Sequence, residues 1–185
     1  MKRDTLSKLE HFMRRGLATK LSNDLKKLRI TKEADIECCV YYHLRRTLPA
    51  DGLWTILARK FAKRTGHYVD LLVLRKKRPR LAIEIKWNRK AMPSKDLRSL
   101  MRALKKLRAN KAYYISVGPD ISEDTYEKIS KNESQKYRLH EVPVGLSLRS
   151  ASLKTDIIKQ WKERRNLLGK NMRLGKAQLK EAWLN

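Results

Sequence analysis

The spacing of hydrophobic positions changes several times along the chain, and each change marks an expected element. Apolar residues recur every three to four positions over Thr31–Leu48, with Thr31 as the helix cap, which is typical of a helix with one buried face. Three strand-like runs follow at Leu53–Phe61, His67–Leu74 and Arg80–Trp87, with turn residues between them. The pattern therefore predicts a helix followed by three strands.

Helical spacing returns in the second half of the chain. A helix is expected over Ser94–Asn110, with Ser94 as its cap, and a strand over Ala112–Val117. A short acidic helix should follow Asp120, and a last strand is expected over Tyr137–Leu148. The order helix, three strands, helix, strand predicts an α/β domain around one sheet.

The 185 residues fit one domain with additions at both ends. Residues 1–30 are expected to form a basic helical extension that is broken near Gly16. Residues 31–150 should form the core, and residues 151–185 a second basic helical extension.

The charge balance narrows the class of partner. Lys and Arg number 45 against 19 Asp and Glu, for a formal net charge of +26. Such an excess opposes folding through self-repulsion, so a polyanion is the simplest partner, with nucleic acid ahead of a membrane surface. No apolar run approaches the ~20 residues of a membrane span, and the N-terminus lacks a secretory signal. Cys38 and Cys39 are adjacent and poorly placed for a disulfide, so an intracellular location, cytoplasm or nucleoid, is expected.

Two neighbouring strands carry charged residues inside apolar runs. Asp70 lies within the second strand, and Glu84 and Lys86 lie within the third. Burial of an unpaired carboxylate costs several kcal/mol or shifts its pKa, so these positions need an explanation. Because side chains alternate across a strand, Glu84 and Lys86 share one face. A hairpin of the two strands brings Asp70 next to Glu84.

The helix before the sheet adds another carboxylate. Glu37 falls within its apolar face, whereas Glu33, one turn earlier, is interpreted as a residue that serves the helix dipole. The apolar face is formed by Ile36, Val40, Tyr41, Leu44 and Leu48. Close carboxylates repel unless a divalent cation lies between them, and hard oxygen ligands favour Mg²⁺, or Mn²⁺. The sequence therefore predicts a metal shared by Glu37, Asp70 and Glu84. Lys86 would orient or deprotonate an attacking water, or stabilise charge on a phosphate.

These residues resemble the PD-(D/E)xK nuclease superfamily, which includes many restriction enzymes, Holliday-junction resolvases and several phage and repair nucleases. The likeness covers about half of the chain and rests on Asp70, on Glu84-Ile85-Lys86 and on Glu37. Val69 stands where the namesake proline of the motif would be.

The resemblance implies a restriction-endonuclease-like αβββαβ core with a mixed central sheet. By the same resemblance Asp70, Glu84 and the backbone carbonyl of Ile85 would ligate Mg²⁺. Lys86 would be the catalytic lysine, and Glu37 would complete the metal site.

Each candidate also has a structural interpretation. Glu84 and Lys86 could form an exposed pair on an edge strand, and Asp70 could end its strand and cap a turn. Glu37 could serve the dipole of its helix.

Basic residues form two groups that are expected to grip phosphates beside the site. The hairpin group is Arg75, Lys76, Lys77, Arg78 and Arg80. The helix group is Arg89, Lys90, Lys95, Arg98, Arg102, Lys105 and Lys106. Zinc fingers, helix-turn-helix motifs and RNA-recognition motifs are not found, so recognition through backbone and shape is expected.

The combined prediction is a Mg²⁺-dependent endonuclease that hydrolyses double-stranded or branched DNA, in the manner of a junction resolvase in recombination or repair. It would be structure-directed or weakly sequence-selective, and two-fold substrates would suit a homodimer. Two alternatives stay open: an RNA-directed nuclease or exonuclease of the same fold, and a non-catalytic nucleic-acid-binding or assembly protein.

Overall fold

A five-stranded sheet organises the part of the chain that carries the predicted site. Its strands are β1 (Trp54–Ala62), β2 (His67–Arg75), β3 (Arg78–Trp87), β4 (Lys111–Val117) and β5 (Leu139–Val144), and they lie side by side in this order. The first three form an antiparallel meander, and β4 and β5 run parallel to β3. The α/β class and the mixed central sheet are thus confirmed.

The computed structural model describes residues 2–62, 67–121, 124–146, 155–160, 162–163 and 166. It divides into two compact units, residues 1–146 and 147–185. Residues 155–160, 162–163 and 166 of the second unit are helical, and the rest of the predicted C-terminal extension lies outside the described residues. Across the described part of the chain, no helix is long and apolar enough to cross a membrane.

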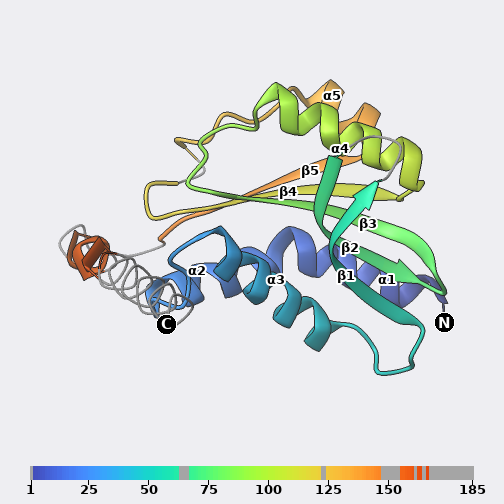
Figure 1. Ribbon diagram of the computed structural model, residues 1–185, viewed down its shortest axis with the longest axis horizontal. Helices are drawn as coiled ribbons and strands as arrows, with labels where there is room; N and C mark the ends of the chain where they lie inside the picture. Colours follow the sequence, from blue (N-terminus) through green and yellow to red (C-terminus); the bar gives the residue numbers. More distant parts are fainter. Residues whose placement is uncertain are drawn as a thin grey trace, which may run out of the picture. The chain divides into compact units, whose positions relative to one another are not determined.

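Helices cover both faces of the sheet (Figure 1). On one face lie α1 (Lys2–His11), α2 (Leu17–Lys26) and α3 (Glu33–Thr47), and on the other lie α4 (Ser94–Leu107) and α5 (Lys131–Tyr137). A parallel pair of strands needs a crossover connection, and α4 supplies it between β3 and β4.

The N-terminal helices belong to the same compact unit as the sheet. A π-helical turn at Phe12–Gly16 joins α1 to α2, so the helix continues through Gly16 instead of breaking there. A buried seam recurs every fourth position and consists of Leu9, Met13, Leu17, Leu21 and Leu25. Buried Asp24 of α2 lies 2.6 Å from His43 Nε2 of α3. Residues 1–30 therefore complete the core instead of standing apart from it.

Several element ends differ from those expected. Lys32, not Thr31, is the N-cap of α3. The Asp35 carboxylate accepts hydrogen bonds from both residues at 2.6–3.1 Å. Pro93 takes the cap position of α4 that Ser94 was expected to hold. On α3 the predicted apolar face is buried except at Tyr41, which is 42% exposed.

The region after β4 also differs. The described residues between Asp120 and Ser130 do not form the expected acidic helix. Instead, α5 begins at Lys131, where Ser130 Oγ accepts a hydrogen bond from Glu133 N. Tyr137 belongs to that helix, so β5 starts at Leu139 and is shorter than the predicted strand.

Leu17→Ala should destabilise the protein by about 3 kcal/mol, because it empties a fully buried position between helix and sheet. Urea unfolding measures this change, with exposed Lys20→Ala as the control on the same helix. A cost below about 1 kcal/mol for Leu17→Ala would show that the N-terminal helices add little to the core.

Candidate active site

The ladder between β2 and β3 ends at Asp70. Paired positions run from Arg75 and Arg78 at the hairpin to Leu71 and Ile83. Beyond them, Ile85 N donates a hydrogen bond of 2.7 Å to Asp70 Oδ2. The carboxylate thus satisfies a strand N–H where the backbone pairing has stopped. The alternative that Asp70 ends its strand and caps a turn is therefore only partly right. Asp70 lies at the end of the backbone pairing, but its carboxylate faces the neighbouring strand and not a turn.

Glu84 and Lys86 lie on the central strand of the sheet. Glu84 is only 8% exposed, so an exposed pair on an edge strand is excluded. Lys86 Nζ donates to Glu84 Oε1 at 2.5 Å and to the Ile85 carbonyl oxygen at 3.0 Å. The second oxygen, Glu84 Oε2, is buried and has no hydrogen-bond partner among the residues described. A buried acceptor without a partner is costly, so this atom calls for a ligand.

The two carboxyl groups are hard to ionise. Burial, and then the charge of Asp70, raise the pKa of Glu84 to about 7, although Lys86 opposes the shift. Burial also raises the pKa of Asp70 to about 6, against the hydrogen bond from Ile85 and the charge of Lys86. Burial alone would lower the pKa of Lys86, but its bond to Glu84 and the charges of Glu84, Asp70 and Glu33 raise it. Lys86 therefore stays an ammonium at neutral pH.

Helix α3 brings two carboxylates to this place. Glu33 Oε2 accepts a hydrogen bond of 3.3 Å from Trp87 N, and Glu33 Oε1 lies 3.9 Å from Lys86 Nζ. Glu37 is half-buried, and its charge raises the pKa of Asp70. The interpretation of Glu33 as a dipole residue alone was incomplete, because it reaches the end of β3 and the lysine.

Asp96 was not predicted as part of the site. It lies in the first turn of α4, and its charge raises the pKa of Glu84 and of Tyr114. Tyr114 is fully buried, and its hydroxyl has no hydrogen-bond partner within the described part of the protein. An acid in the first turn of a helix is common, so the sequence gives no signal that separates Asp96 from a dipole residue.

The two basic groups lie at different distances from the carboxylates. The helix group follows β3 directly and continues along α4, whose first turn holds Asp96. The hairpin group was expected beside the site, but Arg75 is five residues from Asp70 on the same strand. At about 3.4 Å per residue this separation is roughly 17 Å. The hairpin group therefore lies at the opposite end of the β2–β3 pair.

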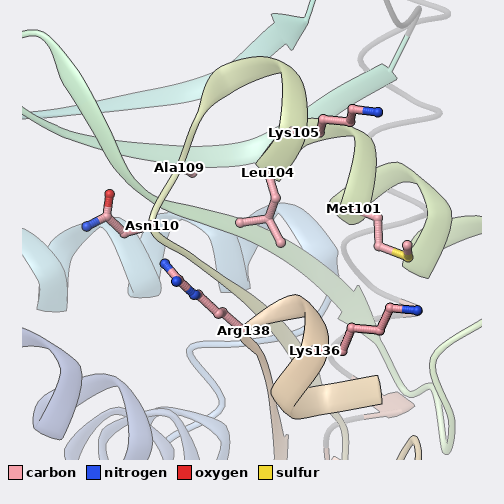
Figure 2. Close-up of a pocket in the computed structure, with 7 residues that line it drawn as sticks. All are labelled: Met101, Leu104, Lys105, Ala109, Asn110, Lys136 and Arg138. Atoms are coloured by element: carbon pink, nitrogen blue, oxygen red, sulfur yellow. The ribbon is translucent and has the colours of Figure 1, made fainter. Parts of the chain in front are cut away.

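A separate hollow opens at that far end of the sheet, and none of the predicted catalytic residues lines it. Figure 2 shows Leu104 of α4 at its centre, with Lys136 and Arg138 across from the helix. The described residues that line it are Met101, Leu104, Lys105, Ala109, Asn110, Lys136 and Arg138.

The donor atoms fit a hard divalent cation in their chemistry. Asp70 and Glu84 offer close carboxylates that resist joint ionisation, and Glu84 Oε2 is unpartnered. In the described part of the chain, no three His, Cys, Asp or Glu side chains are grouped so that they could hold a metal. Lys86 instead bonds Glu84 and the Ile85 carbonyl, two of the predicted ligands.

Comparison of the chain with protein-family models, with curated proteins and with solved structures finds no match. The interpretation of this site therefore rests on its geometry and chemistry.

In EDTA, the protein should lose stability as the pH rises from about 4.5 to about 7, the interval between the ordinary and the raised pKa of Glu84. In this interval the folded state binds more protons than the unfolded state, so stability falls with pH and the full cost is present above pH 7. Glu84→Gln should remove about 3 kcal/mol of this decline.

Urea unfolding at several pH values measures the decline, with exposed Glu127→Gln as the control. If stability depends on pH in the same way in Glu84→Gln and in the wild type, the pKa of the Glu84 carboxyl is not raised.

Proposed function

We propose that this chain is a metal-dependent nuclease of the PD-(D/E)xK kind, with a restriction-endonuclease-like core. One observation carries the proposal: Asp70 and Glu84 meet in a buried patch beside Lys86, and one oxygen of Glu84 has no partner in the described residues. Apolar side chains would stabilise a central strand better than this group does, so stability alone does not explain it.

The residues have separate tasks in this proposal. Asp70, Glu84 and the carbonyl of Ile85 would hold Mg²⁺, or Mn²⁺, which when bound supplies Lewis-acid activation of a phosphate and a water. The raised pKa of Lys86 keeps it protonated at neutral pH, so it serves as a hydrogen-bond donor and not as a base. It would orient the attacking water or stabilise charge that develops on the phosphate.

The α3 glutamates support this arrangement. Glu33 lies within 3.9 Å of the Lys86 ammonium and accepts a bond from the backbone at the end of β3. Glu37, one turn later, adds negative charge near Asp70. Glu33 thus positions the lysine, while Glu37 would complete the metal site.

Nucleic acid is the proposed substrate because of the net charge of +26 and the basic residues that begin beside the carboxylates. Exposed members of the helix group in the loop after β3 and on α4 include Arg89, Lys90, Lys95 and Arg98. The proposed enzyme is an endonuclease for double-stranded or branched DNA. A homodimer would suit substrates with two-fold symmetry.

Asp70→Asn, Glu84→Gln and Lys86→Ala should each lower cleavage at least about a hundredfold, because each removes a group that acts on the reacting phosphate. Their affinity for DNA should change by less than about threefold, because the phosphate-gripping residues remain. Glu33→Gln and Glu37→Gln should lose less activity, since they act through the lysine and the metal.

The assay presents duplex, single-stranded and branched DNA, and RNA, with Mg²⁺, Mn²⁺ or EDTA. Exposed Glu127→Gln is the control and should cleave like the wild type. Normal turnover by any one of the three variants would refute the proposed mechanism. Cleavage in EDTA would show that the reaction needs no metal.

Mg²⁺ or Mn²⁺ should raise the melting temperature of the wild type but not of Asp70→Asn. A cation that binds only the folded state adds roughly 2.7 kcal/mol at about 100 times Kd. Differential scanning fluorimetry with and without EDTA measures the shift. Stabilisation that survives in the Asp70→Asn, Glu84→Gln double variant would place the cation elsewhere.

A further inference from the structure

The tip of the β2–β3 hairpin forms a pocket of about 430 Å³, and the described residues that line it are all cationic: Arg75, Lys76, Arg78 and Arg80. Within the described part of the chain, none of the four forms an ion pair with a carboxylate. The Nε atoms of Arg75 and Arg80 are buried and have no hydrogen-bond partner among the described residues. Four such charges around one hollow repel each other unless an anion lies between them.

The backbone around the pocket holds these side chains at a conformational cost. Lys76 and Lys77 form the two-residue turn, and their φ angles are +49° and +63°. Such a turn favours Asn or Gly, because other residues are strained in the left-handed region. The ladder shifts register beside Arg80, which has no paired position on β2, and such bulges redirect a side chain.

Arg75 is held in place by an aromatic ring. Its guanidinium carbon lies 5.4 Å from the centre of the Trp54 ring, a cation–π contact that leaves its N–H groups available for an anion. The turn, the bulge and this ring contact together arrange cations around the pocket and do not neutralise them.

A basic stripe connects the pocket with the candidate active site. Lys95, Arg98, Arg102 and Lys105 are exposed on one side of α4. The helix begins near Glu84, where Asp96 acts on it, and its 14 residues extend about 21 Å. After the helix, Asn110 N donates to the Arg80 carbonyl at 2.9 Å, beside the hollow of Figure 2.

We propose that the hairpin pocket binds a backbone phosphate of the DNA about five base pairs along the duplex from the cleaved bond. This spacing follows from the roughly 17 Å between Asp70 and Arg75 and from the rise of about 3.4 Å per base pair along the axis of B-DNA. The inference rests on the proposed function, and it makes the α4 stripe the contact for the intervening phosphates. Duplex DNA too short to reach from the carboxylates to the hairpin then loses one anchor.

The first test compares two triple variants that remove the same charge. Lys76→Gln, Arg78→Gln and Arg80→Gln together alter the pocket, while Arg15→Gln, Lys20→Gln and Lys27→Gln alter exposed cations on the N-terminal helices. Binding to fluorescein-labelled duplexes of about 6 to about 20 base pairs is followed by anisotropy in EDTA at several salt concentrations.

The wild type and the N-terminal variant should gain affinity once the duplex is long enough to reach the pocket. The pocket variant should lack this gain, bind long duplexes about tenfold more weakly, and show a log–log salt slope shallower by about 0.9, the contribution of one phosphate. Equal losses of affinity in the two triple variants would overturn the proposal that the pocket binds a phosphate. A gain of affinity with duplex length that persists in the pocket variant would also overturn it.

A second test places the contact relative to the cleaved bond. Neutral methylphosphonates on either strand, about four to six base pairs from the cleaved bond, should slow cleavage by the wild type but not slow the pocket variant further. Equal sensitivity of the two proteins at those phosphates would refute the assignment. If the wild type binds but cleaves no substrate, the proposed function fails, while the length series still decides whether the pocket grips DNA.

Discussion

The Lys86 ammonium is the contact on which the candidate site depends. It bonds Glu84 Oε1 and the Ile85 carbonyl and lies 3.9 Å from Glu33, so one positive charge faces several carboxylates. Without it the buried carboxylates would repel with no compensation, and removal of one partner of a buried pair is strongly destabilising. The central strand can carry Glu84 only because the lysine lies two residues later, on the same face of the sheet.

The β2–β3 pair separates opposite charges by its geometry. At one end the ladder stops and Asp70 takes up the Ile85 N–H, while at the other end a two-residue turn gathers four cationic residues around a pocket. A sheet holds such ends rigidly, because each residue adds a fixed rise of about 3.4 Å. The same two strands therefore position an acidic patch and, roughly 17 Å away, a basic one.

Much of the fold could be predicted from the sequence, because strand alternation and helix periodicity act over a few residues. Glu84 and Lys86 were assigned to one face in this way. The burial of the N-terminal helices could not be predicted, since an apolar residue at every fourth position shows a seam but not the surface on which it packs. Glu33 and Asp96 were missed because acids near a helix start serve the dipole in most proteins. The distance of the hairpin group from the site, in contrast, could have been predicted. The five residues from Asp70 to Arg75 already exclude a place beside the site.

The acidic patch and the excess positive charge are best understood together. The net charge of +26 attracts a polyanion from a distance, but a phosphate that reaches Asp70 and Glu84 meets carboxylates, which repel it. Lys86 offsets only part of that charge, because burial and the charges of neighbouring acids still raise the pKa of both Asp70 and Glu84. On the proposed function, attraction and productive placement are therefore separate requirements: the basic surface holds DNA whether or not the carboxylates are neutralised. The phosphate can approach Lys86 closely only when the carboxylates are neutralised.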